Sequence, residues 1–158
     1  MKGHPESLKL LNEMLRFELT AINIYFCQAK MAKNWGYEKL HGIFQKESIE
    51  EMKHAELVID RILYLDGIPN MAAYNKMKIG SDIQKQFQIN WEMEKGIIDC
   101  LNQGIKKMVD VGDNGTREMA ARILVEEEEH ADWIESQLHA ISEIGLARYL
   151  TEHLHPTT

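Results

Sequence analysis

The chain has 158 residues, of which 44% are apolar, and this is enough to bury the core of one domain of ordinary size. Three prolines, ten glycines and the lack of runs of alternating β-branched residues favour an all-α protein. A formal net charge of −7 without a basic run argues against nucleic acid as a partner and suits metal cations instead.

The sequence also bears on the compartment. No charged-then-apolar leader opens the chain, and no apolar run approaches the ~20 residues that cross a bilayer, so we expect no membrane contact and a cytoplasmic location. Cys27 and Cys100 lie in apolar helical patterns without C-x-x-C spacing, which favours buried free thiols over a disulfide. Asn114-Gly115-Thr116 matches a glycosylation sequon, but without a signal peptide we interpret it as a turn.

Apolar residues that recur every three or four positions predict four long helices and a short fifth one. The expected helices span about 5–33, 38–65, 82–111, 116–143 and 146–153. A short turn signal separates the two helices of each pair, first to second and third to fourth. Residues 66–81, between the two pairs, contain Gly, Pro and Asn without a strong period. We therefore expect a single domain, residues 1–158, in which two antiparallel hairpins are joined by a long crossover into a four-helix bundle.

A Glu-x-x-His motif occurs twice in the helical stretches, as Glu51/His54 and again 76 residues later (127 − 51) as Glu127/His130. The spacing puts a carboxylate and an imidazole one turn apart on the same helical face. Each motif has a glutamate 33 residues upstream, at Glu18 (51 − 18) and Glu94 (127 − 94). A third copy, Glu38-x-x-His41, has Pro5 at the corresponding upstream position, so we interpret it as a solvated helix start.

These six residues interrupt the apolar stripes where burial should be deepest. In each hairpin the glutamate and the Glu-x-x-His pair are about equally far from the turn, with midpoints at 34.5 and 36, (18 + 51)/2 and (18 + 54)/2, and at 110.5 and 112, (94 + 127)/2 and (94 + 130)/2. All six should therefore meet at one level of the bundle. Because an unpaired buried carboxylate costs several kcal/mol, four of them together require a cation.

Oxygen ligands with two imidazoles suit Fe or Mn better than structural zinc. We expect Glu51 and Glu127 to bridge two metal ions, Glu18 and Glu94 to be terminal ligands, and His54 and His130 to supply one nitrogen each. Four glutamates would balance two divalent ions if both histidines bind as neutral imidazoles. Outside this set, Glu47 is expected at an entrance, and a solvated face is the interpretation of Glu126, Glu128 and Glu129.

With this pattern in hand, the chain resembles a bacterioferritin nearly from end to end. The stretches that carry the resemblance are Met1–Gly3, Ala21–Phe26, Lys33–Gly36, Glu47–Ala55, Arg61–Leu63, Gly67–Asn70 and Gly145–Leu146. The resemblance implies a ferritin-like four-helix bundle and a hollow homo-oligomeric shell of about 24 subunits. It implies a ferroxidase that oxidises Fe(II) with O2 or H2O2 at the six-ligand site and stores the Fe(III) mineral inside, with a small ferredoxin as an electron donor for iron release.

The resemblance also gives roles to two further residues. Met52 would be an axial ligand of haem b, one haem for two subunits, although from sequence alone a packing methionine is the simpler interpretation. Apolar walls on that side could come from Leu19, Ile22, Phe26 and Ile49. Tyr25 could hydrogen-bond near the metal pair or donate an electron, and a core tyrosine is an equal alternative.

One departure from the family pattern concerns Lys46, where some bacterioferritins have a histidine that helps hold iron on the inner surface. A lysine cation cannot do this, so such a site is not expected here, although Glu50 could still attract iron. The competing functions are a rubrerythrin-like di-iron peroxidase, which normally carries a C-x-x-C domain that this sequence lacks, and a haem-carrying structural subunit of a mixed shell. A DNA-protecting mini-ferritin is disfavoured by the acidic charge.

Overall fold

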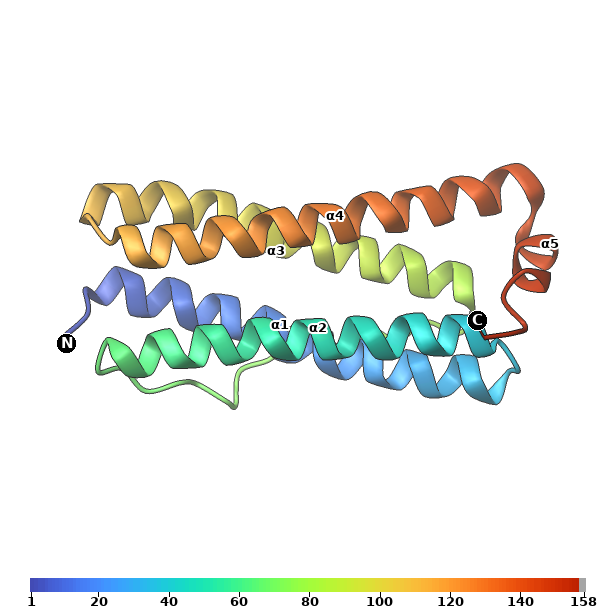
Figure 1. Cartoon of the computed structure of the whole chain (residues 1–158), viewed down its shortest axis with the longest axis horizontal. Helices are drawn as coiled ribbons and strands as arrows, with labels where there is room; N and C mark the ends of the chain where they lie inside the picture. Colours follow the sequence, from blue (N-terminus) through green and yellow to red (C-terminus); the bar gives the residue numbers. More distant parts are fainter. Residues whose placement is uncertain (157–158) are drawn as a thin grey trace.

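The computed structural model describes residues 1–156 and contains four long helices and one short helix in this range. They are α1 (Pro5–Asn34), α2 (Glu38–Tyr64), α3 (Ile83–Val111), α4 (Asn114–Ile144) and α5 (Leu146–Thr151). The helices α1 and α2 form one antiparallel hairpin, and α3 and α4 form the other (Figure 1). The segment between α2 and α3 returns along the bundle, so the predicted all-α fold with a crossover and a short fifth helix is confirmed.

The ends of the helices follow from local capping chemistry. Asp82 caps α3, and its Oδ1 accepts a hydrogen bond from the Lys85 backbone N–H at 2.8 Å. Gly112 ends the same helix with φ of 75°, a left-handed conformation that glycine adopts without steric cost. Asp113 then caps α4 by accepting from the Thr116 N–H at 3.0 Å. These devices keep the α3–α4 turn short and so fix the register of the hairpin.

The apolar interior consists of two clusters, one toward each end of the bundle. The first cluster includes Leu15 of α1, Val58 of α2, Leu101 of α3 and Ile123 of α4. The second, nearer α5, is built from the residues Tyr25, Phe44, Phe87, Ile134 and Tyr149. On every long helix the change from one cluster to the other falls close to a predicted site residue. The bundle therefore holds a polar layer between two apolar ones.

Most predicted helix ends lie within one residue of the observed ones, but two predictions were wrong. The interpretation of Asn114-Gly115-Thr116 as a turn fails, because Asp113 caps the helix and α4 already begins at Asn114. The short fifth helix ends at Thr151 rather than at 153. The predicted domain reaches residue 158, and residues 157–158 lie outside the described range.

Two compositional predictions can also be compared with the structure. Cys27 and Cys100 are free thiols, as expected, but both are only partly buried. Burial raises the pKa of Cys100 to about 11, which keeps this thiol protonated at neutral pH. Within residues 1–156 no helix is both long enough and apolar enough to cross a bilayer.

Candidate metal centre

The six predicted residues meet halfway along the bundle, one or two from each long helix. Glu18 comes from α1, Glu51 and His54 from α2, Glu94 from α3, and Glu127 and His130 from α4. The four carboxyl groups and His54 are buried, whereas His130 is partly exposed. The hairpin register places them together because each lies at a similar distance from its turn.

The donor atoms form two overlapping groups of four. One group is Glu18, Glu51, His54 and Glu127, and the other is Glu51, Glu94, Glu127 and His130. Within each group one donor atom from every residue lies within 4.8 Å of all the others. Because Glu51 and Glu127 belong to both groups, their two carboxylates could each contact two cations, which is the geometry of a carboxylate-bridged pair.

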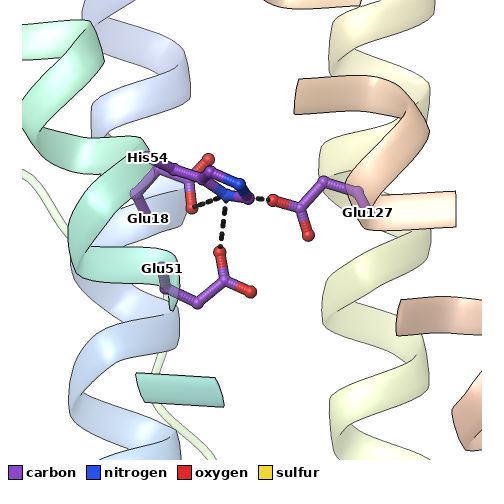
Figure 2. A group of neighbouring side chains, drawn as sticks. All are labelled: Glu18, Glu51, His54 and Glu127. Carbon is purple, nitrogen blue, oxygen red and sulfur yellow. Dashed lines mark hydrogen bonds and ion pairs between the residues drawn. The ribbon is translucent and has the colours of Figure 1, made fainter. Parts of the chain in front are cut away.

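His54 occupies the centre of the first group (Figure 2). Its Nδ1 lies 2.8 Å from Glu127 Oε1, 3.2 Å from Glu51 Oε2 and 3.7 Å from Glu18 Oε2. In the second group, His130 Nδ1 lies 3.3 Å from Glu51 Oε1 and 3.5 Å from Glu127 Oε2. Both imidazoles thus direct the same nitrogen, Nδ1, toward the shared carboxylates.

The buried carboxylates lack enough hydrogen-bond donors. Both oxygens of Glu18 and of Glu127, and Oε1 of Glu51, are buried and accept no well-aligned hydrogen bond among the described residues. The imidazole nitrogens near Glu127 and Glu51, 2.8–3.5 Å away, make ion-pair contacts only. Buried polar atoms in native proteins are almost always partnered, so such a concentration of open acceptors calls for an explanation. A cation between them would supply the missing partner, and the oxygen-rich donor set fits iron or manganese.

The electrostatics of the metal-free cluster agree with this. Burial raises the pKa of Glu18 well above its usual range, and the neighbouring Glu127 and Glu51 raise it further. Burial and the same two carboxylates also raise the pKa of Glu94. Burial opposes the charge of His130, but contacts with Glu127 and Glu51 outweigh it and raise its pKa to about 10. Protons therefore take the place of the cations in the metal-free cluster.

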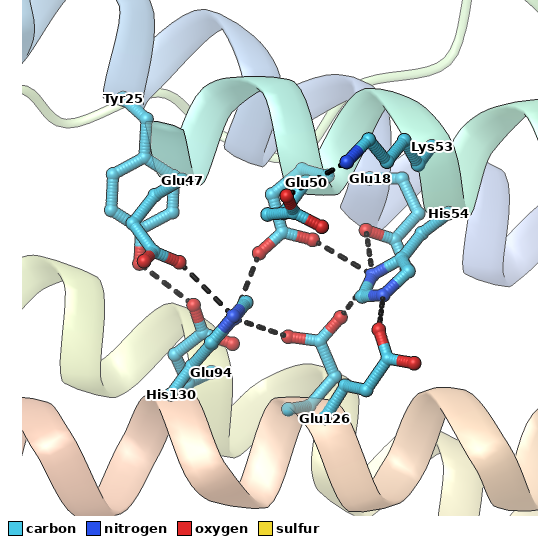
Figure 3. A network of polar contacts seen from close by, with 11 residues as sticks. Glu18, Tyr25, Glu47, Glu50, Lys53, His54, Glu94, Glu126 and His130 are labelled. Carbon is cyan, nitrogen blue, oxygen red and sulfur yellow. Dashed lines mark hydrogen bonds and ion pairs between the residues drawn. The ribbon is translucent and has the colours of Figure 1, made fainter. Parts of the chain in front are cut away.

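Tyr25 lies against the second group. Its hydroxyl donates a hydrogen bond to Glu94 Oε1 at 2.7 Å, and the side chain is 2% exposed (Figure 3). Burial and the nearby carboxylates, Glu94 first among them, raise the pKa of Tyr25 well above its usual range. The tyrosine is thus both a core residue and a contact of the cluster, so the two alternatives left open by the sequence are not exclusive.

Met52 lies on the outside of α2, away from the cluster, and is 48% exposed. Phe26 and Ile49 are also exposed, whereas Leu19 is buried and Ile22 is partly buried. Ser48 donates a hydrogen bond to the Ile22 carbonyl at 2.8 Å, and this register aligns the two stretches of α1 and α2. Met52, Phe26 and Ile49 are thus exposed apolar side chains of this hairpin.

Two carboxylates outside the predicted set contact the histidines from the other side. The sequence interpretation of Glu126 as solvated was wrong in part: it is exposed, but its Oε2 lies 2.6 Å from His54 Nε2. Glu47, which was expected at an entrance, lies 3.1 Å from His130 Nε2. Position 126 precedes His130 by one helical turn, and this was the only sequence signal that it borders the site.

A surface groove of about 690 Å³ opens beside the cluster and contains the outer contacts. Its polar wall is formed by Lys46, Glu47, Glu50, Glu126, Glu129 and His130. Lys53 donates a hydrogen bond to Glu50 Oε1 at 2.9 Å, and this contact lowers the pKa of Glu50. Glu47 is therefore at an opening, as expected, and solvent reaches the cluster on the His130 side.

A glutamate on each of two helices and a Glu-x-x-His pair on each of the other two define the ferritin-like carboxylate class of helical bundles, for which this pattern is a known signature. Comparison with known proteins agrees. A family model described as a ferritin-like domain matches residues 8–144. The bacterioferritin of Mycobacterium bovis is 40% identical over 149 residues, covering 94% of each chain.

Two further relatives extend the match. The bacterioferritin of Streptomyces coelicolor is 40% identical over 157 residues, covering 99% of this chain and 94% of that one. A bacterial ferritin of Synechocystis is 34% identical over 155 residues, covering 98% of this chain and 99% of that one. The chain belongs to the bacterioferritins, within the ferritin-like family, which confirms the resemblance.

Proposed function

We propose that this protein stores iron and that its buried cluster is a ferroxidase centre that oxidises Fe(II) to Fe(III). The observation that carries the proposal is the pair of overlapping four-residue groups that share Glu51 and Glu127. Each group offers three carboxylates and one imidazole nitrogen, a donor set suited to iron. The family membership supports the storage role.

In this proposal Glu18 and His54 complete one Fe(II) position, Glu94 and His130 complete the other, and the two shared glutamates bridge them. Four ionised glutamates carry −4 and two Fe(II) ions +4, so iron binding displaces the protons that the metal-free cluster holds. Each Fe(II) gives up one electron. One O2 takes two electrons and two protons to become H2O2, or one H2O2 takes two electrons and two protons to become two waters.

The chain's own residues prepare this chemistry. The two apolar clusters on either side exclude water from the buried carboxylates, and the partly exposed His130 side leaves an access route from the groove. Tyr25, hydrogen-bonded to Glu94, is suited to pass an electron and the phenolic proton toward the second position. The product Fe(III) would leave through the groove, where Lys46 stands in place of the histidine that holds inner-surface iron in some bacterioferritins.

We further propose that Met52 binds haem b between two copies of the chain. The exposed thioether of Met52, with the exposed Phe26 and Ile49 nearby, could ligate the iron of a haem and contact its planar ring. The haem would supply a one-electron relay. Met52→Ala should lose haem absorbance while Fe(II) oxidation by the loaded cluster continues, and haem retention by the variant would exclude this ligand.

The assembly around this site is also a proposal. Residues 1–158 would form one ferritin-like domain, and about 24 copies would enclose the mineral in the cytoplasm, with a small ferredoxin supplying electrons for release. Size-exclusion chromatography with iron loading tests this directly. A small oligomer that retains no mineral would contradict storage.

The ferroxidase proposal is tested by rapid mixing of Fe(II)-loaded protein, at two Fe(II) per subunit, with O2 or with H2O2. We expect fast Fe(III) absorbance from the wild type and none above buffer from Glu51→Ala or Glu127→Ala. Glu38→Ala is the matched control, because Glu38 opens the Glu-x-x-His copy that lies outside the cluster. Full activity in either bridging variant would overturn the proposal, and Fe(II) oxidation by H2O2 but not by O2 would identify H2O2 as the oxidant.

A further inference from the structure

The two histidines of the cluster are each held by a second carboxylate that comes from the opposite hairpin. His54 on α2 is contacted by Glu126 on α4, at 2.6 Å from its Nε2. His130 on α4 is contacted by Glu47 on α2, at 3.1 Å from its Nε2. Figure 3 shows both contacts on the outer side of the rings. Neither Glu47 nor Glu126 belongs to the two four-residue groups.

We propose that Glu126 is a positioning residue that orients His54 for metal binding, with Glu47 in the matching position for His130. This inference rests on the proposed ferroxidase centre. A neutral imidazole carries one proton, on either nitrogen. A carboxylate at Nε2 holds the proton there, so the Nδ1 lone pair is left for a cation among Glu18, Glu51 and Glu127.

The geometry favours a specific contact over a chance meeting of surface charges. The His54 side chain is 3% exposed and that of Glu126 is 55% exposed, so a surface carboxylate reaches a buried ring. Glu128 and Glu129 lie on the same helix, but neither side chain makes a hydrogen bond or an ion pair within residues 1–156. The run of four glutamates on α4 thus contains Glu127, which belongs to both four-residue groups, and Glu126, which contacts the outer nitrogen of His54.

The two outer carboxylates differ in exposure, so we expect a clean effect from replacing Glu126 but not from replacing Glu47. The side chains of Glu47 and His130 are both partly buried, 19% and 18% exposed. Glu126 is exposed, so its replacement leaves no cavity in the core. The effect of changing Glu126 should therefore be confined to the cation position that contains His54.

Co(II) binding to the metal-free protein gives a readout that does not depend on oxidation. The test compares Glu126→Gln, which keeps an acceptor for Nε2–H, and Glu126→Ala, which removes it, with Glu128→Gln and Glu128→Ala as matched controls. Loss of an outer partner of a metal-binding histidine typically weakens metal affinity 10- to 100-fold. We expect two tight Co(II) per subunit in the wild type and the controls. In Glu126→Ala one Co(II) should bind as tightly and the other about 10- to 100-fold more weakly, with Glu126→Gln between them.

Thermal unfolding without metal separates positioning from a structural role. Glu126→Ala should unfold at the same temperature as Glu128→Ala. Tight binding of both Co(II) by Glu126→Ala would overturn the inference, and so would an equal weakening at both positions together with a lower unfolding temperature. A wild type that binds fewer than two Co(II) would instead overturn the proposed function, and the inference with it.

Discussion

The cost of the metal-free cluster can be measured at Glu18. Its side chain is fully buried on α1, and neither carboxyl oxygen has a hydrogen-bond partner among the described residues. The nearest imidazole nitrogen, His54 Nδ1, lies 3.7 Å away, beyond hydrogen-bond distance. A buried polar group without a partner costs about 1–3 kcal/mol. Glu18→Met removes both oxygens at similar side-chain length, so we expect the metal-free variant to be more stable by about 1–3 kcal/mol.

With metal bound, we expect the wild type to be more stable than Glu18→Met. A cation at 100 times its Kd stabilises the native state by about 2.7 kcal/mol, and Glu18→Met lacks one of the ligands that bind it. For a chain of this size, 1 kcal/mol corresponds to a shift of roughly 2–4 °C in the unfolding temperature. Thermal unfolding with and without Co(II) should therefore give curves for wild type and variant that exchange places.

The control for this experiment is Glu13→Gln on the same helix. Glu13 is partly exposed and pairs with Arg16 at 3.0 Å, a surface contact worth no more than about 0.5 kcal/mol. It should leave both unfolding temperatures nearly unchanged. If metal-free Glu18→Met is less stable than the wild type, Glu18 has a compensating contact in the metal-free state and the reasoning from its open acceptors is refuted.

Three further predictions concern the scaffold and the second position. Partial burial opposes the charge of Asp113, but hydrogen bonds from Thr116 and Arg61 outweigh it and lower its pKa to about 2. The pKa of an aspartate in the unfolded chain is ~3.9. Asp113→Asn should therefore lower the free energy of unfolding by about 1–2 kcal/mol at pH 7, after allowance for solvent screening, and this loss of stability should disappear as the pH falls from about 4 to about 2. A loss that stays constant with pH in urea unfolding would contradict this. Tyr25→Phe leaves Glu94 Oε1 without its hydrogen-bond donor, so we expect a loss of stability of about 1–3 kcal/mol. The variant should still bind two Co(II) but show no tyrosyl radical in electron paramagnetic resonance after iron oxidation. A radical signal as strong as that of the wild type would exclude Tyr25 as the electron donor. A Cβ at Gly104 would lie 2.3 Å from Leu10 Cδ1. Gly104→Ala should therefore destabilise the protein by about 1–2 kcal/mol, because the cost of repacking Leu10 exceeds the gain in helix propensity. Gly42 has open space around it, so Gly42→Ala should stabilise the protein slightly.

The long-range order of this fold could be predicted because it depends on periodic features. Leu15, Val58, Leu101 and Ile123 follow the helical period, and their burial depends on a whole stripe rather than on one side chain. The six cluster residues were found by the same means, since a charged residue on an apolar stripe conflicts with the pattern around it. Local propensity was less reliable: Asn114-Gly115 favours a turn, but the Asp113 cap and its contact with Arg61 at 2.8 Å begin the helix there.

The outer contacts of the histidines could not be predicted, and the reason is physical. The pairing of Glu51 with His54 is set by the geometry of a single helix, so their spacing in the sequence is sufficient evidence. The contact between His54 and Glu126 joins α2 to α4, and it depends on how closely the two hairpins approach and on which rotamer an exposed side chain adopts. The run of glutamates suggested a solvated face for Glu126, but an exposed carboxylate can still contact a buried imidazole when the ring's outer nitrogen faces it. The proposed positioning residue therefore lies where the sequence pattern is weakest, on the rim between two helices that only the closed bundle brings together.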